Sequence, residues 1–154
     1  MKLWSVVTTL FAFAAMSLAT PAMAQDAGAA VKERVAIMKN VSGTMKALAK
    51  SAEAGKVGGK DAERAAKALA GAKKVASLFP ANSGSDMVKT RAKPEIWKDW
   101  AKFEAEASKL VAGLTAVDAA AKAGDAKALA AAVKTAQGTC GGCHKPFRGP
   151  KPKA

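Results

Sequence analysis

The sequence has 154 residues, enough for one domain with a modest core, and carries 25 Lys and Arg against 12 Asp and Glu, a formal net charge of +13. Tyr is absent, and Val, Ile and Phe are sparse and dispersed, so β-strands have little to build on. The commoner residues, Ala and Lys among them, favour helix. The composition argues against a β-rich fold and predicts an all-α one.

The first 24 residues have the pattern of a secretory signal peptide. Lys2 gives a positive start, an apolar run follows over residues 3–20, and Pro21-Ala22-Met23-Ala24 places small residues where a signal peptidase cuts. The alternative is a retained membrane anchor, but a run of about 18 residues rich in Ala, Ser and Thr is marginal for spanning a bilayer. We therefore expect cleavage before Gln25, export, a mature domain over residues 25–154, and no stable membrane insertion after the signal is removed.

Export changes what the positive charge predicts. In a cytosolic protein such an excess would suggest nucleic acid, whereas in an exported one it indicates acidic protein patches or anionic membrane surfaces. Losing Lys2 still leaves +12, and the basic residues are scattered through the predicted helices. A solvated, lysine-rich exterior is the simplest interpretation, and no nucleic-acid partner is expected.

The first two predicted helices are separated by glycines. Residues 28–54 form the first, with one inner stripe at three- and four-residue steps: Val31, Arg34, Met38, Val41, Met45 and Leu48. A second begins near Lys60 and is stopped by Pro80, with its inner face on Ala65, Leu69, Ala72, Ala76 and Phe79. A loop over residues 81–93 follows, long enough to suggest a role at the edge of the domain.

The third and fourth helices complete a predicted bundle. Pro94 suits the first turn of the third helix, whose stripe is Ile96, Trp100, Phe103, Ala107, Leu110, Leu114 and Val117. Gly124 is the expected C-cap, and Asp125 the N-cap of the fourth helix. That helix turns Leu129, Val133, Ala136 and Cys140 inward. Short connections at two of three junctions predict an antiparallel up-down-up-down four-helix bundle.

Alanine-rich stripes leave this bundle short of apolar volume. About 130 residues need more than alanine in the core, so a large apolar group between the helices would fill the deficit.

The only two cysteines and the only histidine lie together in Cys140-Gly141-Gly142-Cys143-His144. C-x-x-C-H is the signature of covalent attachment of c-type haem, in which each thiol adds to a vinyl group and the histidine ligates the iron. A redox-active dithiol normally follows a strand, and none is predicted here. A zinc site would have only these three ligands, crowded into five residues. One covalent haem c, attached through Cys140 and Cys143 and ligated by His144, is the prediction.

The other face of the iron must meet another helix. The mature chain has no second histidine, so the sulfur candidates are Met38, Met45 and Met87. Met38 and Met45 lie on the inner stripe of the first helix, where core packing is the commoner role for methionine. Arg34, one turn before Met38, is a charge on an apolar stripe; a haem propionate, solvent, or a pair with Glu33 would each satisfy it.

With these features the chain resembles the class II cytochromes c, which comprise cytochrome c′ and the low-spin cytochromes of the c-556 type. The resemblance rests on the signal peptide, the four helices and the haem motif near the C-terminus. Shorter matches support it: Ile37-Met38-Lys39, Leu78-Phe79-Pro80, Lys93-Pro94-Glu95-Ile96-Trp97 and Phe147-Arg148.

The resemblance implies roles for individual residues. His144 would be the fifth iron ligand, and Met38 matches the position that faces the distal side of the iron. A methionine there binds iron in the low-spin members, whereas cytochrome c′ leaves the site open to small gases, sometimes with an unligated methionine. Arg34 and Arg148 match basic positions near the haem propionates. Pro146 cannot donate to the Gly142 carbonyl, so we expect a bend after His144 that disturbs the placement of Arg148.

The resulting hypothesis is a periplasmic electron-transfer protein with axial ligands His144 and Met38, and not an enzyme that turns over a substrate. The alternative is a five-coordinate, high-spin cytochrome c′ that binds small gases such as NO and CO. A helical interaction module without a cofactor is a distant third. Redox-partner proteins, acidic ones among them, are the expected partners. The resemblance also implies a homodimer formed through the first two helices as one candidate assembly.

Overall fold

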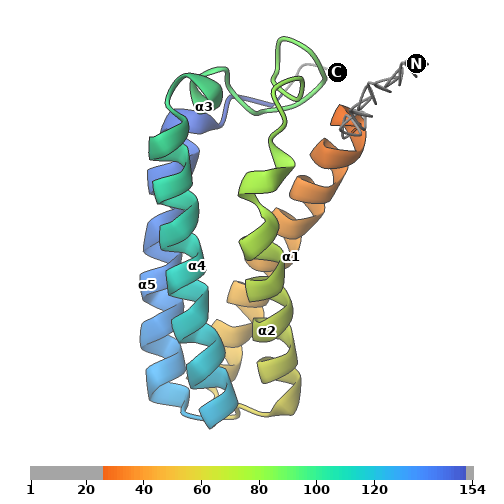
Figure 1. The fold of residues 1–154 in the computed structure, drawn as a ribbon. Helices are drawn as coiled ribbons and strands as arrows, with labels where there is room; N and C mark the ends of the chain where they lie inside the picture. The colour runs from red at the N-terminus through yellow and green to blue at the C-terminus, as the bar shows by residue number, and fades with distance from the viewer. Residues whose placement is uncertain (1–25, 152–154) are drawn as a thin grey trace, which may run out of the picture.

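The computed structural model describes residues 26–151, so the predicted signal peptide lies outside the described residues. The helices are, in chain order, α1 (Ala27–Glu53), α2 (Gly59–Lys74), the 3₁₀ turn η1 (Ala76–Leu78), α3 (Glu95–Lys98), α4 (Trp100–Ala123) and α5 (Ala126–Phe147). Consecutive long helices run in opposite directions (Figure 1), and α1 and α4 each pack against both α2 and α5. The predicted all-α, antiparallel four-helix bundle is confirmed. No helix among the described residues is long and apolar enough to span a membrane.

The predicted caps at the connection between α4 and α5 are confirmed. Gly124 adopts the left-handed conformation, with φ of 68°, that a residue without Cβ takes most easily. The Asp125 carboxylate accepts a hydrogen bond from the Ala128 N–H at 2.9 Å and so begins α5.

Two predicted helix boundaries were wrong. The second helix does not continue to Phe79: it ends at Lys74, and the chain tightens into η1, where the Phe79 N–H donates to the Ala76 carbonyl at 3.3 Å. The third helix is divided at Asp99, which leaves helical geometry and accepts from the Lys102 N–H at 3.3 Å as the N-cap of α4.

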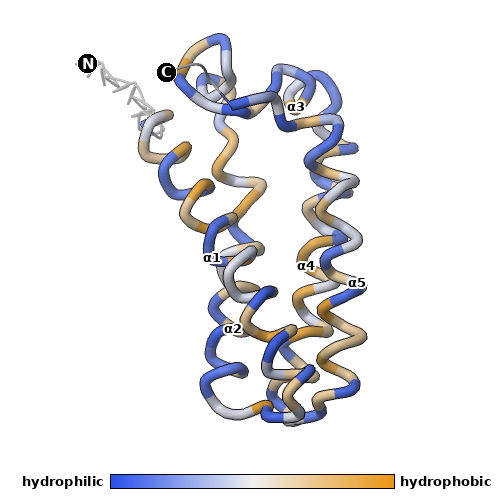
Figure 2. Tube along the Cα trace, turned by 180° about the vertical axis from the view of Figure 1, so that it is seen from behind, coloured by the Kyte–Doolittle hydropathy of each residue, from blue (hydrophilic) through white to orange (hydrophobic). Residues whose placement is uncertain are grey.

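The four long helices each carry both hydrophobic and hydrophilic positions (Figure 2), and the buried apolar residues form two separate clusters. The larger cluster joins the second half of α1 to α2, α4 and α5, and many of its members are alanines. A Cβ on Gly113 of α4 would lie 3.1 Å from Ala136 of α5, so small residues let these two helices approach closely.

The second cluster is aromatic and lies at the other end of the bundle. Its residues come from η1, the segment after it, α3, the start of α4 and the end of α5: Ala76, Phe79, Ala92, Ile96, Trp97, Trp100, Phe103, Cys143 and Phe147. Phe103 is at its centre, with ring centroids of Phe79 and Phe147 at 4.7 and 5.5 Å. No residue of α1 belongs to it, and α1 diverges from α5 toward this end of the bundle (Figure 1).

Residues 79–94, which we call the connecting segment, link α2 to α3 and also contact α1 and the end of α5. Ala92 forms an isolated antiparallel bridge with Arg148, and the Lys93 N–H donates to the Phe147 carbonyl at 3.0 Å. Buried Arg34 holds the segment from the side of α1. The long predicted loop therefore has a structural role at the edge of the bundle.

Candidate haem site

The C-x-x-C-H motif occupies the last two turns of α5. Cys143 is partly buried and packs against the aromatic cluster, whereas Cys140 is exposed. The prediction that Cys140 is turned inward needs correction. It continues the stripe of Val133 and Ala136, but the helix that would cover it, α1, has diverged at this level (Figure 1). Both thiols are free and one helical turn apart.

His144 follows Cys143 and is half-buried. Burial first, and then the positive charges of Arg148 and Arg91, lower the pKa of His144 below its ordinary value. These influences favour the neutral imidazole, which is the form that ligates a metal. Two free thiols, a neutral histidine and an adjacent aromatic cluster therefore fit a covalently attached haem.

The side of α1 that diverges from α5 carries apolar residues without cover. Val35 is 45% exposed, Met38 is partly exposed, and neither packs on a core cluster. Val31, Val35 and Met38 are spaced at four and three residues, so they share one face of α1. Val35 was missed by the sequence analysis, although its spacing from Met38 was a usable signal. This face has the apolar character that a haem face requires.

The three candidate methionines have different environments. Met45 is buried in the larger core cluster and has the role of a packing residue. Met87 is 64% exposed in the connecting segment. Met38, between these extremes, is the candidate for the distal side of the iron.

Arg34 is 5% exposed, and its four terminal N–H groups all donate to the segment that follows η1 or to η1 itself. Nη1 donates to the Leu78 carbonyl at 3.0 Å and to the Ser83 hydroxyl at 2.8 Å. Nη2 donates to the Ser83 carbonyl at 2.7 Å and to the Thr90 hydroxyl at 3.0 Å. The guanidinium also lies 4.2 Å from the centre of the Phe79 ring. Burial lowers its pKa to about 10.

These contacts change the interpretation of Arg34. Neither solvent nor Glu33 satisfies the terminal nitrogens, because the connecting segment and Leu78 do. Of the five donors of a guanidinium, Nε–H is left for a haem propionate.

Arg148 lies one turn beyond His144, and its N–H donates to the His144 carbonyl at 3.1 Å. The expected bend after His144 does not end the helix: α5 continues through Pro146 to Phe147. The Pro146 carbonyl accepts from Lys93 Nζ at 3.0 Å, so the connecting segment supports this last turn. Arg91, which the sequence analysis did not select, adds a second positive charge near His144.

Glu106 of α4 was also missed. Its side chain packs so closely against Gly142 that a Cβ at this position would collide with the carboxylate. Lys109 pairs with Glu106 at 2.6 Å. Burial, then Glu106 and Cys140, raise the pKa of the Cys143 thiol. A Cβ at Gly142 would require the flexible Glu106 carboxylate to move aside, and in the structure this acidic side chain lies against the haem-attachment turn.

The sequence pattern of the cytochrome c′ family matches residues 29–148, which include most of α1, the connecting segment and the complete haem motif. The chain belongs to the cytochrome c′ family. It is 31% identical to cytochrome c′ of Rhodospirillum rubrum over 89% of this chain and 93% of that protein. It is 33% identical to cytochrome c-556 of Agrobacterium tumefaciens strain B2A over 77% of this chain and 95% of the relative.

Solved structures agree with this family. The crystal structure of cytochrome c′ from Rubrivivax gelatinosus superposes with a TM-score of 0.71 at 30% identity, over 80% of this chain and 98% of the other. Members of the family bind a covalently attached c-type haem, and this class II cytochrome c is an electron-transfer haem protein. The relatives include both cytochrome c′ and cytochrome c-556.

Proposed function

We propose that this cytochrome is a periplasmic one-electron carrier whose haem is attached through Cys140 and Cys143 and ligated by His144 and Met38. The observation that carries the proposal is the placement of both thiols and a half-buried histidine on the last turns of α5, beside an aromatic cluster. When bound, the haem supplies an Fe(III)/Fe(II) couple, and the protein supplies ligands, burial and access for partners. Catalytic turnover of a substrate is not part of the proposal.

Two features support His144 as the proximal ligand. Its burial and the neighbouring Arg148 and Arg91 keep the imidazole neutral and available to iron. The hydrogen bond from the Arg148 N–H to the His144 carbonyl continues the helix past the ligand and fixes its backbone.

Met38 as the distal ligand is supported by its partly exposed position on the uncovered face of α1. A core methionine would be expected to be buried, as Met45 is. Val31 and Val35 on the same face of α1 would cover the porphyrin around it. Arg34 and Arg148 are proposed to face the propionates, Arg34 through its Nε–H.

The second candidate function is that of a five-coordinate cytochrome c′ with an open distal site for NO or CO. The names of the relatives favour it to some extent, since cytochrome c′ is the commoner name among them. In that case Met38 would pack beside the haem without binding iron.

Optical spectra of the purified protein in both oxidation states separate the two functions. Met38 ligation predicts a low-spin ferric protein with the weak red charge-transfer band of methionine–iron ligation and slow or poor CO binding. Met38→Ala should then turn the spectrum high-spin and open the site. Met45→Ala is the matched control: it should keep the low-spin spectrum and lower stability by roughly 2–5 kcal/mol. A parent protein that is already high-spin, with fast CO binding unchanged by Met38→Ala, contradicts Met38 ligation.

A further inference from the structure

The two ends of the bundle differ in charge. The motif end, which we define as residues 86–95 and 143–151, holds six Lys and Arg against two Asp and Glu, a net charge of +4. The turn end, defined as residues 53–64 and 118–127, holds five of each and is neutral. The positive charge of the protein is therefore distributed unevenly along the bundle.

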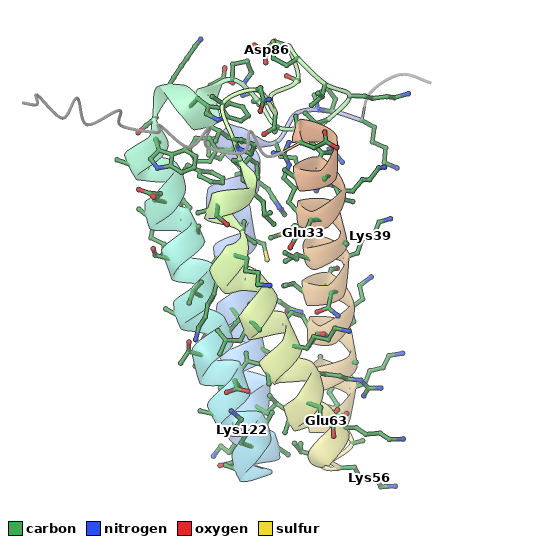
Figure 3. All side chains as sticks on the ribbon, turned by 45° about the vertical axis from the view of Figure 1, so that its right-hand side comes forward. Glu33, Lys39, Lys56, Glu63, Asp86 and Lys122 are labelled. Atoms are coloured by element: carbon green, nitrogen blue, oxygen red, sulfur yellow. The ribbon has the colours of Figure 1, made fainter. Side chains whose placement is uncertain are left out.

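Figure 3 shows the separation of these ends. Asp86 lies at one extreme of the bundle, and Lys56 and Lys122 lie at the other. The motif end has few anions to offset its cations: Asp86 is exposed, and the second acid, Glu95, lies 3.7 Å from Lys93.

Hydrogen bonds hold the two segments of the motif end together. The Lys93 N–H donates to the Phe147 carbonyl at 3.0 Å, and the Gly149 N–H donates to the Arg91 carbonyl at 2.7 Å. Arg91 Nε donates back to the Gly149 carbonyl at 2.7 Å. Cations from both segments are thereby brought to the same end of the bundle, although more than 50 residues separate the segments in the chain.

Four of the six cations are exposed: Lys89, Lys145, Arg148 and Lys151. Met87, which is 64% exposed, adds one large apolar side chain at the motif end, two residues before Lys89. We call these five residues the basic surface. Lys145 directly follows the proposed iron ligand, so the basic surface borders the part of the chain that carries the haem.

We propose that the basic surface docks an acidic face of a redox-partner protein, so that electrons enter and leave at the motif end. The proposal rests on the proposed function, because it requires the haem on Cys140 and Cys143. Complementary charge accelerates and orients encounters between proteins, and an exposed apolar side chain within the charged area is typical of an interface.

A protein partner fits better than a membrane surface. Helices that lie on membranes have a broad apolar face opposite their basic residues. The basic surface comes instead from an irregular segment and the end of α5, and its only large exposed apolar side chain among the described residues is Met87.

The test compares two triple variants with the same change in net charge. Lys89→Glu/Lys145→Glu/Lys151→Glu alters the basic surface, and Lys56→Glu/Lys60→Glu/Lys127→Glu alters the turn end as the matched control. The ferrous protein is oxidised in a stopped-flow instrument by ferricyanide or by tris(phenanthroline)cobalt(III). Each oxidant accepts one electron from the haem iron, and their charges are opposite. Binding to poly-L-glutamate and to phosphatidylglycerol vesicles is measured in parallel.

At low ionic strength the basic-surface variant should react with ferricyanide at least about 10-fold more slowly than the parent protein, and with the cobalt complex faster than the parent. Both differences in rate should shrink as salt is added. It should also lose poly-L-glutamate binding, whereas the control should change each rate by less than about 3-fold. Equal effects in both variants, or none in either, would overturn docking at this surface. Vesicle binding that depends on the basic surface, without a dependence for poly-L-glutamate, would assign it to a membrane instead.

The haem spectrum distinguishes this failure from a failure of the proposed function. Equal rates in variants with an intact spectrum overturn the docking proposal alone. A parent protein without covalent haem overturns both.

Discussion

Replacing Arg34 by Met should release the connecting segment from α1. The substitution keeps an unbranched side chain but removes four hydrogen bonds from a buried cation and its contact with the Phe79 ring. Hydrogen bonds from charged groups contribute about 1.5–3 kcal/mol each when counted singly. The sum overstates the loss, because the four share one guanidinium and the freed acceptors of Ser83 and Thr90 can move into water. Removing the cation also removes the unfavourable free energy of burying it.

We therefore expect Arg34→Met to lower the free energy of unfolding by about 2–4 kcal/mol, with a fall in Tm of about 10 °C. The loss should be concentrated in the connecting segment rather than in the core around Leu114 and Leu129. Arg34→Lys keeps the charge without the planar fork, so it should recover part of the stability.

Thermal melts and hydrogen exchange measured by mass spectrometry test this expectation. Peptides covering residues 83–93 should exchange faster in Arg34→Met, while peptides from the second half of α4 and the first half of α5, around Leu114 and Leu129, should keep the parent rates. A change in stability below about 0.5 kcal/mol, with unchanged exchange in 83–93, would refute the conclusion that Arg34 anchors the connecting segment.

Three further predictions concern the haem-attachment turn. The Cys140→Ala/Cys143→Ala variant without haem should be largely unfolded or molten by far-UV circular dichroism, because the alanine-rich core lacks volume; a cooperative melt like that of the parent would contradict this. Arg148→Gln removes a cation that lowers the pKa of the axial histidine, His144. In an acid titration, the protonation and loss of this ligand should therefore move to higher pH. An unchanged midpoint of the titration would show that Arg148 does not act on the ligand. Glu106→Gln should raise the midpoint potential of the haem, because a nearby carboxylate favours the ferric state. The control Glu104→Gln, at an exposed position on the same helix, should change the potential less. Equal shifts in the two variants would assign the effect to net charge.

Local sequence signals predicted the ends of the helices where one residue decides the geometry. Gly124 has no Cβ and so takes the left-handed conformation that ends α4, and the carboxylate of the adjacent Asp125 caps the start of α5. The break at Asp99 was missed because this residue lies between apolar residues at helical spacing. Aspartate is favoured at helix N-caps, which was a usable signal for a break. The apolar stripe that runs past Asp99 without interruption led instead to the prediction of one continuous helix.

The environment of Arg34 could not be predicted from its neighbours in sequence. Its partners are 44 to 56 residues away, and the acceptors are carbonyl and hydroxyl groups that leave no periodic pattern. The exposure of Cys140 has a similar origin. Its position on the inner stripe was readable, but the divergence of α1 depends on how whole helices pack. Glu106 could not be selected from the sequence, because an acidic residue on a solvated helix is common. Only its contact with Gly142 in the structure distinguishes it from the other acidic residues of α4.

The central claim of this account is that one haem is bound covalently through Cys140 and Cys143. Extraction of the purified protein with acidified acetone, followed by intact mass measurement, tests it most directly. We predict that the haem stays with the polypeptide and that the mass equals the chain from Gln25 plus one haem. Haem in the acetone phase, or a polypeptide with the mass of the bare chain, would contradict the claim.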